Sequence, residues 1–101
     1  MVQVREIAPG EVEVLPSGHL TREDMDELAK GLADALALAK GAIVLNFEAL
    51  KSLNSSIIGK LLHFKAQCDQ KGIRLSIRHC NAEMLQLLKM IRFDSLIQME
   101  I

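Results

Sequence analysis

The amino-terminal part of the chain changes from a two-residue rhythm of apolar positions to a helical one. Apolar residues alternate with polar ones over 2–7 and 12–14, and Pro9-Gly10 stands between these two stretches. Alternation with a period of two is typical of strands, so we expect two short strands joined by a turn. From about Arg22 the apolar residues recur every three or four positions, which predicts a helix with one face packed on a sheet.

Both ends of this first helix carry terminal signals. Thr21 stands three residues before Asp24, the spacing at which a hydroxyl and a carboxylate satisfy the first free amides of a helix. At the other end Gly41 follows Lys40, and glycine very commonly ends helices. We therefore expect the helix to lie between these two signals.

The middle of the chain predicts a buried strand followed by a second helix. Residues 42–47 are apolar except for Asn46, a pattern typical of a central strand that is buried on both faces. Three residues that favour helix starts follow at 54–56, so we expect a helix that runs to about Lys71 and ends at Gly72.

The last third of the chain predicts a strand, a helix and a further strand. Residues 73–78 show the clearest period-two pattern, which is typical of a half-exposed strand near an edge. Asn81 caps the third helix, and the short apolar segment 96–101 follows it. The apolar positions of the third helix are Met84, Leu87, Leu88 and Ile91.

Together these elements predict a single α/β domain over residues 1–101, with the order β-β-α-β-α-β-α-β. Strands that alternate with helices across short connections are parallel and joined by right-handed crossovers, whereas the first two strands form an antiparallel pair. We therefore expect a mixed sheet of about five strands with helices packed on it.

Charge and composition narrow the possible functions. Twelve basic and thirteen acidic residues give a net charge of -1, so no global field attracts nucleic acid or an anionic membrane surface. The three aromatic residues are all Phe, which argues against the stacking platforms that bind single-stranded nucleic acid. No apolar run approaches the roughly 20 residues that span a bilayer, so we expect no membrane insertion.

The cysteines and the amino terminus indicate a cytoplasmic protein. Cys68 and Cys80 form no Cys-x-x-Cys motif, and the first residues lack the basic-then-apolar pattern of a signal peptide. We expect both thiols to be free in a reducing compartment.

The segment 53–60 is the most informative candidate site, because it leads from a strand into a helix, where α/β sheets usually place their sites. Helix capping alone also explains the residue types at 54–56. The pair Gly59-Lys60 does not complete a phosphate-binding loop, since Asn54 replaces the first glycine of that motif and Leu61 its hydroxyl residue.

No catalytic or metal site can be assembled from the remaining candidates. His63 and Cys68 lie five positions apart on a helix and point in different directions, and the neighbours His79 and Cys80 also diverge. The sequence offers no convergent nucleophile, base and oxyanion donor. We therefore expect no enzymatic activity, no cofactor and no metal.

Three segments, in this order of elements, resemble the STAS domain family, which includes bacterial anti-sigma-factor antagonists. They are the apolar strand 43–47, the segment 53–62 and the Lys71-Gly72 turn into the next strand. In the family an apolar strand ends in Asp-Leu-Ser, and Asp-Ser-Ser/Thr-Gly-Leu-Gly then opens a helix. The resemblance covers nearly the whole chain and implies a STAS-like fold.

The resemblance also assigns residues. Ser55 falls on the serine that antagonists have phosphorylated by their partner kinase, Ser56 on the second hydroxyl residue and Gly59 on the second glycine. Segments 18–20 and 93–96 are similar to the family's Gly-x-Leu and Gly-Leu-Asp-x-Leu.

The departures from the family pattern remove charge. Asn54, Asn46 and Thr21 stand where the family usually has Asp, and Ile57 replaces the first glycine. Asn keeps the capping hydrogen bond of Asp, but it presents no negative charge to a kinase or its metal ion.

The resemblance implies a non-enzymatic anti-sigma-factor antagonist that acts by partner switching with an anti-sigma factor or serine kinase. In this role the residue of the chain that is phosphorylated is Ser55, with Ser56 as the alternative. The missing carboxylates leave a second function open, an unphosphorylated STAS subunit of a lipid-asymmetry transporter or of a stress-signalling scaffold. The partner-binding residues that the resemblance implies are Thr21, Asn54, Ser55, Ser56, Ile57, Ile58 and Lys60.

Overall fold

The structure, a computed structural model, describes residues 1–100 and has the predicted order β-β-α-β-α-β-α-β; Ile101 lies outside the described residues. The strands are β1 (Val2–Ala8), β2 (Glu11–Pro16), β3 (Ala42–Asn46), β4 (Arg74–Arg78) and β5 (Gln98–Glu100). The helices are α1 (Met25–Leu38), α2 (Ser55–Lys71) and α3 (Ala82–Met90), with short 3-10 turns η1 (Arg22–Asp24) and η2 (Phe93–Ser95).

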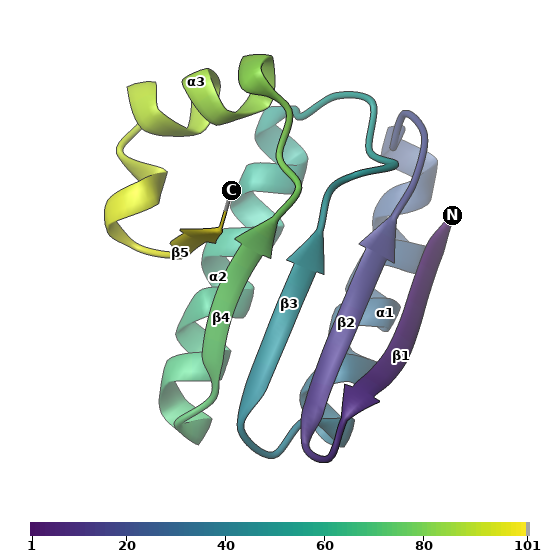
Figure 1. The fold of residues 1–101 in the computed structure, drawn as a ribbon. Helices are drawn as coiled ribbons and strands as arrows, with labels where there is room; N and C mark the ends of the chain where they lie inside the picture. The colour runs from purple at the N-terminus through teal and green to yellow at the C-terminus, as the bar shows by residue number, and fades with distance from the viewer. Residues whose placement is uncertain (101) are drawn as a thin grey trace.

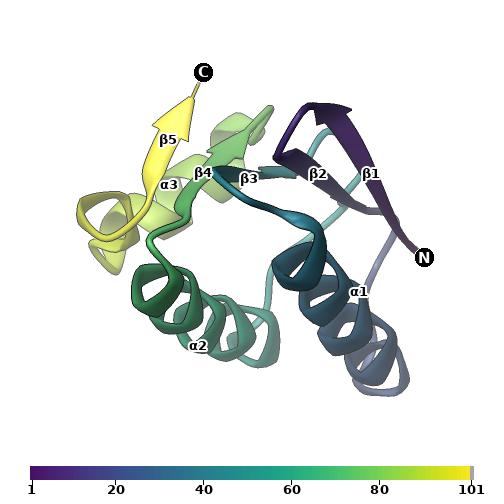
Figure 2. The same ribbon diagram turned by 90° about the horizontal axis from the view of Figure 1, so that it is seen from below.

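The strands form one mixed sheet in the order β1-β2-β3-β4-β5. β1 pairs antiparallel with β2, and every other neighbouring pair is parallel, which confirms the predicted topology. Helices α1 and α2 lie behind the sheet in Figure 1, and Figure 2 shows them together on one face. α3 lies at the end of the sheet where the parallel strands finish, so within residues 1–100 the opposite face of the sheet carries no helix (Figure 1).

The face of the sheet that the two helices cover is aliphatic and forms the core. Alternate residues of β2, β3 and β4 point into it because side chains of a strand alternate between faces. These are Val12, Val14, Ile43, Leu45, Leu75 and Ile77. α2 contributes the fully buried side chains of Ile57, Leu61, Phe64 and Cys68.

Two glycines are needed in the fold, one for close packing and one for its backbone conformation. A Cβ atom built on Gly31 of α1 would lie 2.7 Å from the Cγ1 atom of Val2, so only glycine lets the helix approach β1 this closely. Gly72 ends α2 where predicted, with a left-handed backbone at φ 70° that glycine adopts without strain.

The end of α1 differs from the prediction. The helix ends at Leu38, before the glycine signal at Gly41, and Ala39 is already extended. The amides of Lys40 and Gly41 both donate to the Gly10 carbonyl, at 3.0 Å each. These contacts with the β1–β2 turn direct the chain into β3.

The apolar stripe of α3 is also narrower than the sequence suggests. Met84 and Leu88 are buried, but Leu87 is exposed, and so is Ile91 just beyond the helix. Since α3 lies at the end of the sheet rather than on its face, only one row of its side chains meets the core.

Candidate functional site

The candidate site is built on the connection 47–54, which leads from β3 to α2. Gly18 donates its amide to the Ala49 carbonyl at 2.9 Å, and its own carbonyl accepts the Lys51 amide at 3.0 Å. Leu50 between them is buried, and it bridges Gly18 in a parallel register. The connection is therefore held against the segment that follows β2.

Asn54 is the last residue of this connection, and both polar atoms of its side chain form hydrogen bonds. Its Oδ1 atom accepts the Ile57 amide at 2.9 Å, which caps α2, and its Nδ2 atom donates to the Leu20 carbonyl at 3.2 Å. Asn54 is thus the helix cap expected for this region, and it also places the start of α2 beside the residues preceding α1.

Ser55 and Ser56 are the first two residues of α2, and both are exposed. The first turn of the helix contains no acidic residue. The free backbone amides and the positive end of the helix dipole therefore lie beside these hydroxyls without a neutralising side chain on the helix.

The other residues that the family resemblance assigns to the partner surface differ in accessibility. Ile58 and Lys60 are half-buried, whereas Ile57 is 2 % exposed and packs in the core. Ile57 is therefore a structural residue of α2, because a side chain buried this deeply has no surface to offer a docked partner.

Thr21 lies next to Leu20, which accepts the hydrogen bond from Asn54. Both its backbone amide and its hydroxyl donate to Asp24 Oδ2, at 2.7 and 2.9 Å. These hydrogen bonds lower the pKa of the Asp24 carboxyl from its ordinary value. The structure thus brings Thr21 and Asn54 to the same end of the sheet, with the Thr21 hydroxyl already bonded.

An apolar groove of about 320 Å³ runs between the connection and α3, and the sequence did not predict it. Met90 lines this groove and is 74 % exposed. The sequence contains one signal for this groove, because α3 has more apolar residues than a single narrow face can bury. The groove is lined by Lys51, Ser52, Leu53, Asn81, Glu83, Met84, Gln86, Leu87 and Met90.

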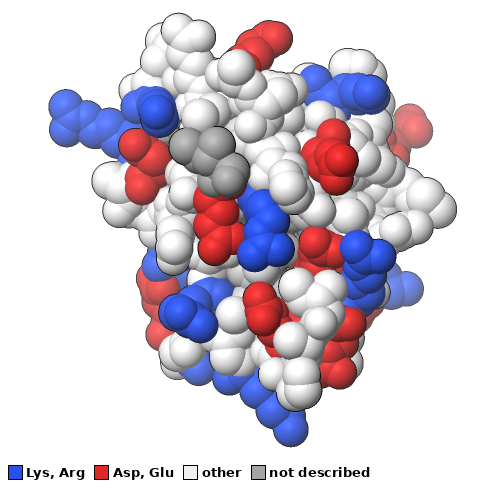
Figure 3. Space-filling model, viewed as in Figure 1, with Lys and Arg blue, Asp and Glu red and all other residues white. Residues whose placement is uncertain are grey.

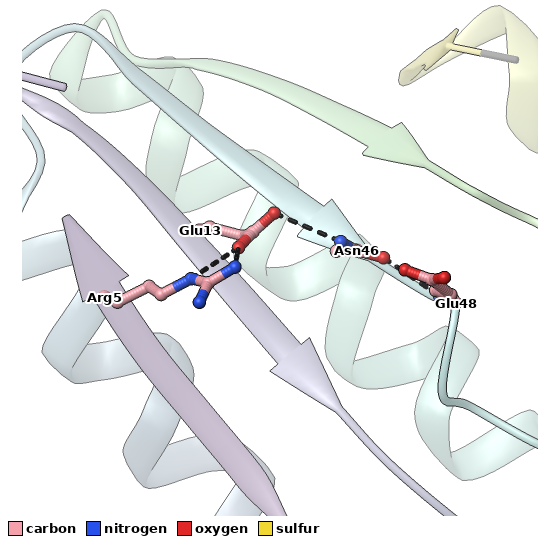
Figure 4. Close-up of polar contacts among 4 residues, drawn as sticks. All are labelled: Arg5, Glu13, Asn46 and Glu48. Carbon is pink, nitrogen blue, oxygen red and sulfur yellow. Dashed lines mark hydrogen bonds and ion pairs between the residues drawn. The ribbon is translucent and has the colours of Figure 1, made fainter. Parts of the chain in front are cut away.

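The open face of the sheet carries charged groups of both signs rather than a patch of one sign (Figure 3). One polar cluster on this face was also not predicted from the sequence (Figure 4). Glu13 of β2 is 5 % exposed, and it accepts hydrogen bonds from Arg5 Nε at 2.8 Å and from Asn46 Nδ2 at 3.1 Å. Asn46 is 6 % exposed, and its Oδ1 atom accepts the Glu48 amide at 3.0 Å. Nothing in a single sequence shows that these strand positions become neighbours.

One histidine lies at the candidate site, since the Nδ1 atom of His19 is hydrogen-bonded to the Oγ atom of Ser52 at 3.0 Å. Both thiols are free. Burial raises the pKa of the Cys68 thiol to about 11, and burial also raises the pKa of Cys80 above its ordinary value. Within residues 1–100 no three His, Cys, Asp or Glu side chains lie close enough together to hold a metal ion.

No helix in the described part of the chain has the length and apolar character needed to cross a bilayer.

Comparison with solved structures identifies the fold. An anti-sigma factor antagonist from Mycobacterium paratuberculosis matches with a TM-score of 0.84 at 14 % identity, covering 98 % of this chain and 83 % of that one. A putative antagonist from Thermotoga maritima matches with a TM-score of 0.85 at 16 % identity, covering 97 % and 84 %. The phosphorylated form of the Bacillus cell fate determinant SpoIIAA matches at 0.77 and 16 %, covering 100 % and 92 %. No curated protein matches the sequence significantly.

The sequence itself matches the family model described as "Mlab, STAS domain" over residues 5–98. This match covers nearly all of the residues that build the sheet, the helices and the connection before Ser55. The solved structures resemble the chain in fold at low identity, and the family model matches its sequence. The chain therefore belongs to the STAS domain family.

Proposed function

We propose that this chain is a non-enzymatic interaction domain that acts by partner switching, as an anti-sigma-factor antagonist regulated at Ser55. The observation that carries the proposal is the exposed position of Ser55 at the start of α2, directly after a connection that Asn54 and Gly18 hold in place. A kinase reaches this hydroxyl without unfolding the domain. The partner is an anti-sigma factor or a serine kinase that docks at the same end of the sheet.

Phosphorylation at Ser55 would act on the interface rather than on the fold. A phosphate adds roughly -1.5 to -2 charges, and the free amides at the start of α2 accommodate them. The first turn of α2 has no acid to repel the phosphate. A docked partner, however, would have to strip water from the new charge, which is costly without a matching cation.

The groove beside α3 supplies apolar area for the same partner. Its wall includes Leu53, the residue before Asn54, together with Leu87 and Met90 of α3. A partner that fills the groove would therefore extend toward Ser55, and a charge placed there would lie at the edge of an apolar contact. This arrangement favours a switch that needs no conformational change within the domain.

Phosphate mapping and binding measurements test the proposal. The purified domain is incubated with ATP and each serine kinase encoded in its genome, and mass spectrometry locates any phosphate. Calorimetry then compares the affinity of that kinase for the wild type and for Ser55→Asp, with Ser56→Asp as the matched control. We expect Ser55→Asp to weaken binding by about tenfold or more. Ser56→Asp should weaken it less. Equal affinities for the wild type and Ser55→Asp would contradict partner switching.

A second candidate function is that of an unphosphorylated subunit, either of a lipid-asymmetry transporter or of a stress-signalling scaffold. Two observations favour it: the neutral residues Asn46, Asn54 and Thr21, and the description of the matching family model, "Mlab, STAS domain". Co-expression with a transporter ATPase encoded beside it tests this alternative. Co-elution that Ser55→Asp leaves unchanged, on a chain without phosphate, would favour the subunit and count against the antagonist.

A further inference from the structure

The carboxylate of Glu13 lies almost completely buried on the face of the sheet opposite α1 and α2. Both oxygen atoms of Glu13 are engaged (Figure 4). Oε1 accepts Nε and Nη2 of Arg5, each at 2.8 Å, and Oε2 accepts Nδ2 of Asn46 at 3.1 Å. A buried charge is tolerated only when it is paired and hydrogen-bonded, so this residue depends on both partners.

Two neighbours determine which way the Asn46 amide points, and Glu13 is one of them. A carboxylate only accepts hydrogen bonds, so Glu13 must face the Nδ2 end of Asn46. The opposite end, Oδ1, then faces the Glu48 amide and accepts it at 3.0 Å. The Glu48 amide only donates and requires the same direction, so Glu13 and Glu48 together fix the orientation of the Asn46 amide.

Glu48 lies at the beginning of the connection that carries the candidate site. Phe47 donates its amide to the Arg78 carbonyl, and its own carbonyl accepts the Leu50 amide at 3.1 Å. Lys51 is then bonded to Gly18. The bond from Glu48 to Asn46 is therefore one of the contacts that set the turn from which the chain runs on to Asn54 and Ser55.

We infer that Glu13 is a positioning residue for the partner-binding site: acting through Asn46, it fixes the start of the connection that presents Ser55. The inference rests on the proposed function for the meaning of that site. The hydrogen-bond chain itself runs from Arg5 on the edge strand to Glu48, so a group on the open face of the sheet sets the geometry at its end.

Donor and acceptor chemistry predicts which substitutions this chain of bonds tolerates. In Glu13→Gln the single amide cannot accept from both Arg5 and Asn46, so one of those donors loses its partner. In Asn46→Asp two carboxylates face each other with no proton between them. In the double variant Glu13→Gln/Asn46→Asp, the new amide accepts from Arg5 and donates to the new carboxylate, which still accepts the Glu48 amide. The double substitution therefore preserves every hydrogen bond of this network, whereas neither single substitution does.

Asn46 has a charged neighbour on β4, Arg78. Arg78 is the cross-strand partner of Asn46, and its Nε and Nη2 atoms bind Glu100 Oε2 at 2.9 Å. If Arg78 turned to neutralise the new carboxylate, the Asn46→Asp variant would resemble the wild type. The experiment therefore compares all three variants rather than one.

Hydrogen exchange of backbone amides by NMR tests the inference without any partner protein. We expect Glu13→Gln and Asn46→Asp each to speed exchange of the Glu48 amide by about tenfold, since each disturbs a charge-assisted network. Both should also shift the amide resonances of 50–56. The double variant should restore both readouts. Glu11→Gln, on the same strand and face, is the matched control and should change neither.

A Glu13→Gln variant that behaves like the wild type, or a double variant that fails to restore the Glu48 amide, would overturn the inference. Urea unfolding of each variant separates this local effect from a general loss of stability. Should either single variant fail to fold, the double variant still decides the question. Since no partner enters the measurement, a negative result leaves partner switching at Ser55 untouched, and a failure of partner switching leaves this result unchanged.

Discussion

Two helices begin at the same end of the sheet with the same capping residue, but the connections that precede them differ. Asn54 accepts the Ile57 amide at 2.9 Å and starts α2; Asn81 accepts the Met84 amide at 2.8 Å and starts α3. β4 reaches Asn81 after only two residues, whereas the chain from β3 to Asn54 is longer and bonds to the Gly18 segment. The cap is therefore common to both helices, and the anchored connection is specific to α2.

The difference shows what capping explains and what it does not. α3 opens with Ala82 and Glu83, so an acid already lies beside the positive end of its dipole. α2 opens with Ser55 and Ser56 and has no acid in its first turn. Capping accounts for both Asn residues, but it does not account for the exposed pair of hydroxyls at an end that no acid neutralises.

The largest expected effect concerns how firmly the two helices are packed. Phe64 of α2 is fully buried, so Phe64→Ala should lower the free energy of unfolding by about 3–5 kcal/mol. Met90 of α3 is exposed, so Met90→Ala should change it by less than about 0.5 kcal/mol. Urea unfolding measures both values. A loss below about 1 kcal/mol for Phe64→Ala would mean that α2 is not the rigid support that the candidate site requires.

The cysteines distinguish the two regions chemically. Burial raises the pKa of Cys68, on the core face of α2, from 9.0 to about 11, whereas Cys80 lies half-buried just before α3. At pH 8 Cys68 therefore forms about a hundredfold less thiolate than an unburied thiol. We expect a thiol reagent to label Cys80 first in the folded protein. The variants Cys68→Ala and Cys80→Ala assign the two rates, and faster labelling of Cys68 would contradict its burial.

The raised pKa of Cys68 also predicts a dependence of stability on pH. The unfolded chain ionises this thiol near pH 9, while the folded chain keeps it protonated to about pH 11. The stability that this thiol contributes is therefore complete below pH 9 and is lost as the pH rises toward 11. Urea unfolding across this range should show the wild type losing stability relative to Cys68→Ala. A difference between the two proteins that stays constant would contradict the raised pKa.

The sequence predicted the fold better than the site because the two depend on different contacts. Apolar periodicity and the signals at Asn54, Gly72 and Asn81 are local, so the strands and helices followed from them. The link between Glu13 and Asn46 joins side chains of different strands, and no local pattern records it. The groove beside α3 likewise depends on where that helix lies, which periodicity alone does not determine.

The two caps should differ moderately in strength. Asn81→Ala should lower the free energy of unfolding by about 1 kcal/mol, the usual cost of losing a cap. Asn54→Ala should cost about 2 kcal/mol, because the bond from Nδ2 to the Leu20 carbonyl is lost as well. Asn54→Asp keeps the capping oxygen but not the Nδ2 donor, so its loss in the free energy of unfolding should lie between those of the two Ala variants. Equal losses for both Ala variants would show that the tie to Leu20 contributes nothing.

The smallest effect tests the charge at the start of each helix. Ser55→Asp should raise the free energy of unfolding by about 0.3–1 kcal/mol, since a carboxylate there meets an unneutralised dipole. Ala82→Asp, at the matching position of α3, should gain less because Glu83 already lies beside it. Ser55→Asn is the neutral control, and about 1 M salt should remove most of the gain. If Ser55→Asp instead destabilised the domain, a charge at Ser55 would disturb the fold itself, and a switch confined to the interface could not operate there.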